Sequence, residues 1–286
     1  MKIGMLTGLW YISDSMLLME SLRRAAALGF RYVDLHGVFH GGPAHLTQDD
    51  AKAVKREMEL LGLTPRNYVC HAPHNIPSAD EATLEVDFDY LKKGIDLATL
   101  WGVNQMMLNA GQWAFGVERD EAWNRSVRFL QRLCDYASQR DVFIVQEAEP
   151  YVWFLVNDIE STVRMMEDVA RPNFTTLVDL GHLALAREGK KDIERLGNSI
   201  IHAHFSDHEP YSHTNQTIGT GFTHTKEYLD ALRDLEIDRQ VERFGYEELV
   251  VSFELGVPGD SIDDPDNRVR RSIEYVQQVA PYMTLA

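Results

Sequence analysis

Four residues that can bind a metal stand at the ends of successive apolar runs in the second half of the chain. These residues are Glu147, Asp179, His204 and Glu254. A single acidic or histidine residue at a strand end is usually a helix cap or a surface charge. Four in succession indicate a shared site, because buried carboxylates that face a histidine are destabilising unless a cation neutralises them. We therefore predict that the four side chains bind one divalent ion, and that Glu147 and Glu254 also transfer protons.

The donor types limit the identity of the metal. Three carboxylates and one imidazole form a mostly hard set, which suits Mn²⁺, Mg²⁺ or Co²⁺ better than a structural, thiolate-rich zinc site. We favour Mn²⁺, with Mg²⁺, Co²⁺ or Zn²⁺ as alternatives.

Further polar residues are expected to line the same pocket. His182 follows Asp179 by three residues, and we favour contact with a substrate oxygen or a second metal over a helix-start histidine that pairs with Asp179 or a carbonyl. His71 and Asn109 close two earlier runs and are predicted to bind substrate rather than metal. On the run that ends at His204, we expect that residue alone to face the interior, with His202 packed under helices.

Aromatic residues gather in the segments that follow these runs. They fit the wall of a sugar pocket, because sugar C–H faces stack on aromatic planes, and they fit equally well as packing that holds long loops down. We assign Trp113 to substrate binding. The residues are Trp10, Tyr11, Phe39, Trp113, Phe115, Tyr151 and Trp153.

The apolar runs alternate with helical patterns along the whole chain. Buried runs separated by helices indicate parallel strands with right-handed crossovers, and eight such units favour a closed (β/α)8 TIM barrel. The predicted strands are 2–7, 31–36, 66–72, 105–110, 142–147, 175–179, 200–204 and 249–254. The predicted helices are 16–29, 49–62, 89–102, 121–139, 158–169, 225–235 and 267–279.

The chain has no Pro/Gly/Ser-rich linker, so we predict one domain over residues 1–286. The longest connections, including 206–224, follow strands rather than helices. In a barrel they lie at the C-terminal face, where active sites are built.

Charge and composition exclude several classes of partner. The net charge of −16 repels phosphate backbones and anionic lipids, so we expect neither nucleic acid nor membrane as a partner. Cys70 and Cys134 lie within apolar or helical patterns and are predicted to be buried thiols. No signal peptide or long apolar run is recognised, so we expect a cytoplasmic protein.

The motifs resemble those of the xylose isomerase-like TIM barrels, which include sugar phosphate isomerases, ketose 3-epimerases, inosose dehydratases and relatives of endonuclease IV. "VDLGHLAL" resembles the family's Asp-x-x-His motif, and "IIHAHFSD" resembles its His-x-His-x-x-Asp motif, which "IGTG" follows. "IVQEAEP" and "VVSFELG" match its two glutamate strands. The resemblance implies Glu147, Asp179, His204 and Glu254 as metal ligands, with His182 touching substrate.

Two departures from family patterns limit the assignment. The endonuclease branch adds ligands that this chain replaces with Asn109, His213 and Asn215, which disfavours a trinuclear site, and we assign His213 to substrate binding. Ketose 3-epimerases commonly carry an arginine in the loop 206–224 and an acidic residue soon after the strand-five glutamate. Here that loop has no arginine, and Trp153 stands at the second position. Ketohexose epimerisation in particular is therefore disfavoured.

The leading hypothesis is an isomerase or epimerase of a keto-sugar or polyol that forms an enediolate by carboxylate proton abstraction. The alternative is a carbon–oxygen or carbon–carbon lyase that begins with the same step, as in inosose dehydration or β-elimination from a 3-oxo-glycoside or C-glycoside. An endonuclease of abasic DNA is less favoured. The expected partners are a carbohydrate substrate and either a second copy of the chain or an accessory subunit.

Overall fold

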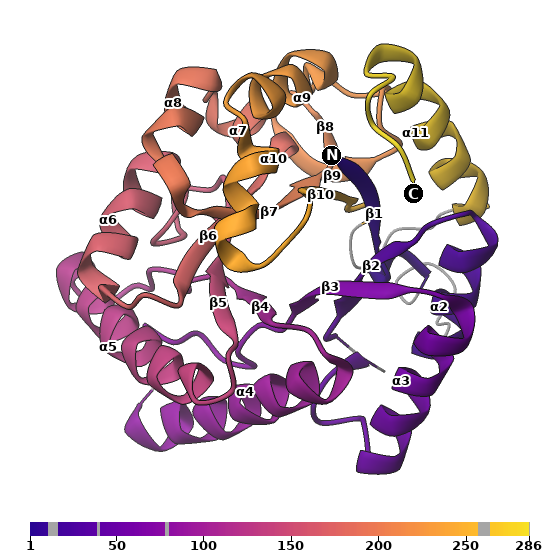
Figure 1. The fold of residues 1–286 in the computed structure, drawn as a ribbon. Helices are drawn as coiled ribbons and strands as arrows, with labels where there is room; N and C mark the ends of the chain where they lie inside the picture. The colour runs from indigo at the N-terminus through magenta and orange to yellow at the C-terminus, as the bar shows by residue number, and fades with distance from the viewer. Residues whose placement is uncertain (11–16, 39–40, 78–79, 257–263, 286) are drawn as a thin grey trace.

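Eight parallel strands close into a barrel in the computed structural model, which describes residues 1–10, 17–38, 41–77, 80–256 and 264–285. Each strand lies beside the next barrel strand in the chain, and the last one closes against the first (Figure 1). The predicted (β/α)8 barrel is confirmed. The strands are β1 (Lys2–Leu6), β2 (Tyr32–His36), β3 (Thr64–Val69), β4 (Gln105–Leu108), β5 (Phe143–Gln146), β6 (Phe174–Asp179), β7 (Ile200–Phe205) and β10 (Val250–Phe253).

Helices surround the strands as an outer ring. Two of them end on glycines that the sequence marks, Gly62 and Gly102, whose φ angles of 67° and 75° lie in the left-handed region that favours glycine. The short helices α7 and α8 between β6 and β7 were not among the predicted elements. The helices are α2 (Leu18–Ala27), α3 (Gln48–Leu61), α4 (Glu81–Trp101), α5 (Arg119–Ser138), α6 (Ile159–Val169), α7 (Leu180–Ala186), α8 (Lys190–Arg195), α9 (Thr225–Asp234), α10 (Ile237–Gln240) and α11 (Pro265–Val279), with 3₁₀ turns η2 (Gly197–Ser199) and η3 (Val241–Phe244).

Two apolar clusters hold the barrel together. The larger one packs the strands against the surrounding helices and includes the buried thiols of Cys70 and Cys134, as predicted. The smaller one takes a single residue from each of six barrel strands. It supports the polar residues that follow these strands at the barrel mouth. Its members are Leu6, Val69, Met107, Val145, Leu177 and Ile201.

An antiparallel hairpin occupies part of segment 206–224, which was predicted to be a loop. Its strands are β8 (Asp207–Glu209) and β9 (Ser212–Gln216). Asp207 anchors the rest of the segment, because its carboxylate accepts hydrogen bonds from the backbone N–H groups of Gly219 and Gly221 at 2.8 Å each. The polar sequence of the hairpin hides it from a search for apolar alternation.

The expectation that His202 packs under helices is wrong. Residues two apart on a strand point to the same face, so His202 and His204 both face the barrel interior. Both lie against the carboxylate of Asp34 on β2, and all three side chains are fully buried. In the described part of the chain, every helix is too short or too polar to cross a membrane.

Candidate active site

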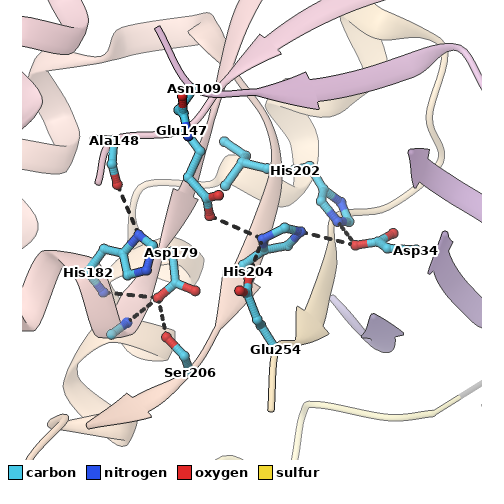
Figure 2. A network of polar contacts seen from close by, with 12 residues as sticks. Asp34, Asn109, Glu147, Ala148, Asp179, His182, His202, His204, Ser206 and Glu254 are labelled. Atoms are coloured by element: carbon cyan, nitrogen blue, oxygen red, sulfur yellow. Dashed lines mark hydrogen bonds and ion pairs between the residues drawn. The ribbon is translucent and has the colours of Figure 1, made fainter. Parts of the chain in front are cut away.

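The four predicted metal ligands meet at the C-terminal mouth of the barrel. Candidate donor atoms of Glu147, Asp179, His204 and Glu254 all lie within 4.8 Å of one another. The strand register explains the convergence: Asp179 pairs with His204 across β6 and β7, and His204 pairs with Ser252, two residues before Glu254. Glu147 directly follows β5. Figure 2 shows Glu147 and Glu254 reaching the His204 ring from different strands.

His204 lies between two carboxylates. Its Nδ1 is 3.1 Å from Glu147 Oε1 and 3.0 Å from Glu254 Oε2. Burial opposes a charge on the imidazole, but Glu147 and the other carboxylates outweigh it and raise the pKa of His204 well above its usual value. Burial likewise raises the pKa of Glu147, and His204 only partly offsets this effect. For Glu254, hydrogen bonding and charge from His204 overcome burial and lower the pKa.

The two carboxylate oxygens of Asp179 have different surroundings in the described part of the chain. One accepts hydrogen bonds from the protein, and the other does not. Oδ1 accepts hydrogen bonds from the backbone N–H groups of Gly181 and His182, at 2.6 and 3.0 Å, and from Ser206 Oγ at 2.7 Å. It thereby caps α7, which begins directly after β6. Oδ2 is buried and has no hydrogen-bond partner within the part of the chain that the structure describes. Burial opposes ionisation of Asp179, but the charge of His182 lowers its pKa.

These residues fit a divalent cation. Asp179 belongs to the cluster of four, and its buried Oδ2 has no hydrogen-bond partner among the described residues, whereas Glu254 Oε2 has only its contact with His204 Nδ1 at 3.0 Å. Leaving ionised oxygens unpaired in a buried site costs several kcal/mol, and a cation removes that cost. Three carboxylates with one imidazole form the kind of donor set that hard or borderline divalent ions prefer.

A second layer of side chains, which the sequence did not predict, lies behind His204. Asp34 Oδ2 accepts a hydrogen bond from His202 Nε2 at 2.7 Å and lies 3.3 Å from His204 Nε2. Metal-binding histidines commonly direct their other ring nitrogen toward a carboxylate, which fixes the orientation of the ring. The sequence does mark Asp34 as an acidic residue inside the apolar run "YVDLH". Nothing in that run indicates that Asp34 contacts the histidines of β7.

His182 makes the contacts of a helix-start histidine, because its backbone N–H donates to Asp179 and its ring contacts a carbonyl, while its contact with substrate stays a prediction. Its Nδ1 lies 2.9 Å from the carbonyl oxygen of Ala148, which can only accept, so Nδ1 carries a proton. Its Nε2 lies 2.7 Å from His213 Nε2, and this bond joins the two histidines predicted to touch substrate. Burial opposes the charge of His182, but Asp179, Glu147 and Glu149 outweigh it and raise its pKa to about 9. Burial and the charge of His182 lower the pKa of His213 to about 4.

His208 supports Asp179 through a serine, and this link was also missed. Its Nδ1 accepts hydrogen bonds from the backbone N–H groups of Thr214 and Asn215, at 3.0 and 3.2 Å. The proton of the neutral ring must therefore be on Nε2, which lies 2.8 Å from Ser206 Oγ. Ser206 in turn donates to Asp179. His182, His208 and His213 form another cluster of possible metal ligands, but this arrangement leaves His208 Nε2 protonated and unable to bind an ion.

The remaining predicted pocket residues lie at neighbouring strand ends. His71 Nδ1 accepts a hydrogen bond from the backbone N–H of Asn109 at 3.4 Å, and Asn109 Oδ1 accepts one from Gly111 N at 3.1 Å. Neither residue belongs to the cluster of four. Trp113 lies in the segment after β4, and its indole N–H donates to the carbonyl of Val117 at 2.7 Å. The assignment of these three residues to substrate stays a prediction.

A family model described as xylose isomerase-like TIM barrel matches residues 22–279. The chain belongs to this family. The closed barrel agrees with this membership, and the resemblance inferred from the sequence motifs is confirmed.

Individual relatives are more distant. A fructoselysine 3-epimerase from Shigella flexneri is 24% identical over an alignment 290 residues long. The alignment covers 97% of this chain and 99% of the relative. Among solved structures, a D-psicose 3-epimerase with D-tagatose from Clostridium cellulolyticum H10 aligns with a TM-score of 0.80 at 16% identity, covering 98% of this chain and 99% of the other. An IolI protein described with a bound zinc atom aligns with a TM-score of 0.77 at 16% identity, covering 99% of both chains. At these identities the solved structures support the fold alone.

Proposed function

We propose that this protein is a divalent-metal-dependent epimerase or isomerase that acts on a keto-sugar or keto-polyol. The observation that carries the proposal is the convergence of Glu147, Asp179, His204 and Glu254 at the barrel mouth, where the buried Oδ2 of Asp179 has no partner among the described residues. The similarity over nearly the whole chain to a protein named fructoselysine 3-epimerase supports a sugar substrate. Mn²⁺ remains the favoured ion on the basis of the donor set.

The chemistry follows from the weak acidity of a carbon next to a carbonyl. A bound divalent cation would polarise the substrate carbonyl and stabilise the negative charge that develops on oxygen. Glu147 and Glu254 come from β5 and β10, which are not neighbours in the barrel, so their carboxylates can flank a substrate. In the proposed reaction one ionised carboxylate removes the proton beside the carbonyl, forming an enediolate, and the other group, as a neutral carboxylic acid, donates its proton to the opposite face.

His182 and His213 would orient the substrate oxygens. Their hydrogen bond holds both rings beside Asp179, and His182 carries an N–H on Nδ1 that is already satisfied by Ala148. The Nε2 atoms of the two rings are therefore the groups able to exchange their mutual bond for bonds to substrate. Asp34, His202, Ser206 and His208 would position the ligands and not touch substrate.

The lyase alternative begins with the same proton abstraction, but the comparisons do not favour it. The relatives reported above include epimerases and no lyase. The action of an abasic-site endonuclease is disfavoured by the net charge of −16 and by the replacement of the additional ligands with Asn109 and Asn215.

The deciding experiment is exchange of the α-proton in D₂O. Protein loaded with Mn²⁺ is incubated with a panel of ketoses and aldoses that includes fructoselysine, and proton loss is followed by NMR. We expect exchange together with an epimeric or isomeric product for at least one substrate. Release of water or aglycone, with ultraviolet absorbance from an unsaturated product, would instead establish the lyase. Absence of exchange with every member of the panel would refute the proposed chemistry.

A further inference from the structure

Four aromatic side chains form a surface beside the candidate active site, which we call the aromatic shelf. Trp113 and Phe115 come from the segment after β4, and Tyr151 and Trp153 come from the segment after β5. The rings of Tyr151 and Trp153 stack with centroids 4.5 Å apart and planes inclined by 8°, and those of Trp113 and Phe115 stack at 6.2 Å and 24°. Two other aromatic residues noted in the sequence, Tyr11 and Phe39, lie outside the described residues.

The shelf is exposed to an extent that is unusual for large apolar side chains. Phe115 is 100% exposed, Trp153 46% and Trp113 38%. A contiguous exposed apolar surface at a loop-built mouth commonly marks a binding site. The rings stack on one another, as the packing alternative from the sequence requires, but Phe115, Trp153 and Trp113 remain exposed to solvent.

The backbone beneath the shelf is held in place by hydrogen bonds between the two segments. Trp113 N donates to Trp153 O at 2.7 Å, and Leu155 N donates to Gly111 O at 3.1 Å. Asn75, from the segment after β3, bonds both the N–H and the carbonyl of Gln112 at 2.7 Å each. The shelf is therefore preorganised, which reduces the entropy lost when a ligand stacks on it.

The shelf is continuous with the candidate active site. The hydroxyl of Tyr151 accepts a hydrogen bond from His213 N at 3.1 Å, and the two rings meet edge to face with centroids 6.2 Å apart. His213 bonds His182, whose backbone N–H donates to Asp179. A path of direct contacts thus runs from a proposed metal ligand to the exposed ring of Trp153.

We propose that the aromatic shelf binds a planar substituent without negative charge that the sugar substrate carries, while the sugar itself occupies the metal site. This inference rests on the proposed function. The continuity with His213 and His182 favours part of the substrate over a second protein copy as the occupant. Neither segment, 109–118 or 147–158, contains a lysine or arginine, so these two segments supply no cation for an anionic substituent. Aromatic rings stack favourably on planar groups of this kind.

The test compares bare and substituted ketoses. Proton exchange is measured with D-fructose, D-tagatose and D-allulose, and with derivatives that carry a phenyl group at either end, as 1-deoxy-1-phenylamino ketoses and as 6-O-phenyl ketoses. The quantity of interest is the ratio of kcat/KM for the substituted sugar to kcat/KM for the matching bare sugar. We expect a ratio above 1 for the wild-type protein, and a decrease of about tenfold in that ratio for Trp153→Ala.

Two further variants keep the result interpretable. Phe115→Ala removes a fully exposed ring, so it should fold normally and lower the same ratio. Leu60→Ala is the matched control, because Leu60 is 82% exposed but lies on α3 near the start of β3, at the opposite end of the barrel. The control should leave the ratio unchanged.

Failure of the shelf is distinguishable from failure of the proposed function. If bare sugars react and the shelf variants leave the ratio unchanged, the substituent site is refuted while the epimerase proposal stands. If the variants dissociate a dimer in sedimentation and leave the ratio unchanged, the shelf is an interface between copies. If no sugar reacts, binding is measured as quenching of the fluorescence of Trp153. Quenching by 1-deoxy-1-phenylamino polyols is then compared with quenching by the unsubstituted polyols. Equal quenching by the two would refute the shelf as well.

Discussion

Asp179→Asn separates metal binding from structure more sharply than any other change in the site. Asp179 Oδ1 accepts three hydrogen bonds from protein donors, whereas no described residue bonds Oδ2. Asparagine can keep its carbonyl oxygen at the Oδ1 position, so the cap on α7 and the bond from Ser206 survive. The amide NH₂ group then replaces Oδ2 and cannot bind a cation.

The expected magnitude follows from binding linkage. At a Mn²⁺ concentration about 100 times Kd, binding stabilises the native protein by about 2.7 kcal/mol. A chain of 286 residues has an unfolding entropy of about 0.6 kcal/mol per degree, so Mn²⁺ should raise the Tm of the wild-type protein by about 4–5 °C. A variant that binds 100-fold more weakly gains only about 0.4 kcal/mol, which is a shift below about 1 °C.

Asp207→Asn is the matched control for this measurement. Its carboxylate accepts four backbone N–H groups, two on each oxygen, and it lies outside the cluster of four. The asparagine loses two of these bonds at a cost of about 1–3 kcal/mol, so the Tm should fall while the Mn²⁺ shift persists. Each protein is scanned by calorimetry at one fixed rate with and without Mn²⁺. An undiminished Mn²⁺ shift in Asp179→Asn would show that Asp179 is not a ligand.

Three further predictions address the proton-transfer group, the second layer and the pH dependence. Glu147→Gln, tested at saturating Mn²⁺ by NMR, should reduce proton exchange by about 10²–10⁴-fold, and exchange at the wild-type rate would exclude Glu147 as a proton carrier. Asp34→Ala removes the carboxylate behind His204 and should weaken Mn²⁺ binding by about 10–100-fold in calorimetric titration, whereas unchanged affinity would limit Asp34 to a structural role. Burial raises the pKa of Glu188 from 4.5 to about 7 despite the hydrogen bond from Ile159 N, so the protonated form is favoured on folding. The stability it provides is complete below about pH 4.5 and is lost as the pH rises through 7. In Glu188→Gln this loss is absent, so the decrease in Tm from pH 5 to pH 8 should be smaller than in the wild-type protein. The change is less than the full pKa shift implies, because the Glu188 side chain is partly exposed. An unchanged decrease would contradict the assignment.

The sequence predicts the barrel and the four strand-end residues because both depend on patterns of apolar and polar residues within single short segments. Each barrel strand is an apolar run, and its last polar residue stands out against that run. Asp34 could not be found in this way, because its partner His202 lies 168 residues away and only the closed barrel brings β2 and β7 into reach. Ser206 and His208 were missed because they lie in and beside a polar hairpin that has no apolar periodicity.

The division of the site between strands and loops has a chemical consequence. Glu147, Asp179, His204 and Glu254 sit at or just beyond the ends of β5, β6, β7 and β10, which are consecutive neighbours in the barrel. Their separation is therefore fixed mainly by the strand register, and the segment 206–224 adds support through Ser206, which donates to Asp179, and Asn215, which donates to Glu254. The aromatic shelf instead depends on two loop segments bonded to each other outside the barrel. Substitutions there should change which substituted sugar is accepted while the proton-transfer step is retained, because the contacts from the shelf to the metal-ligand candidates run through His213 and His182.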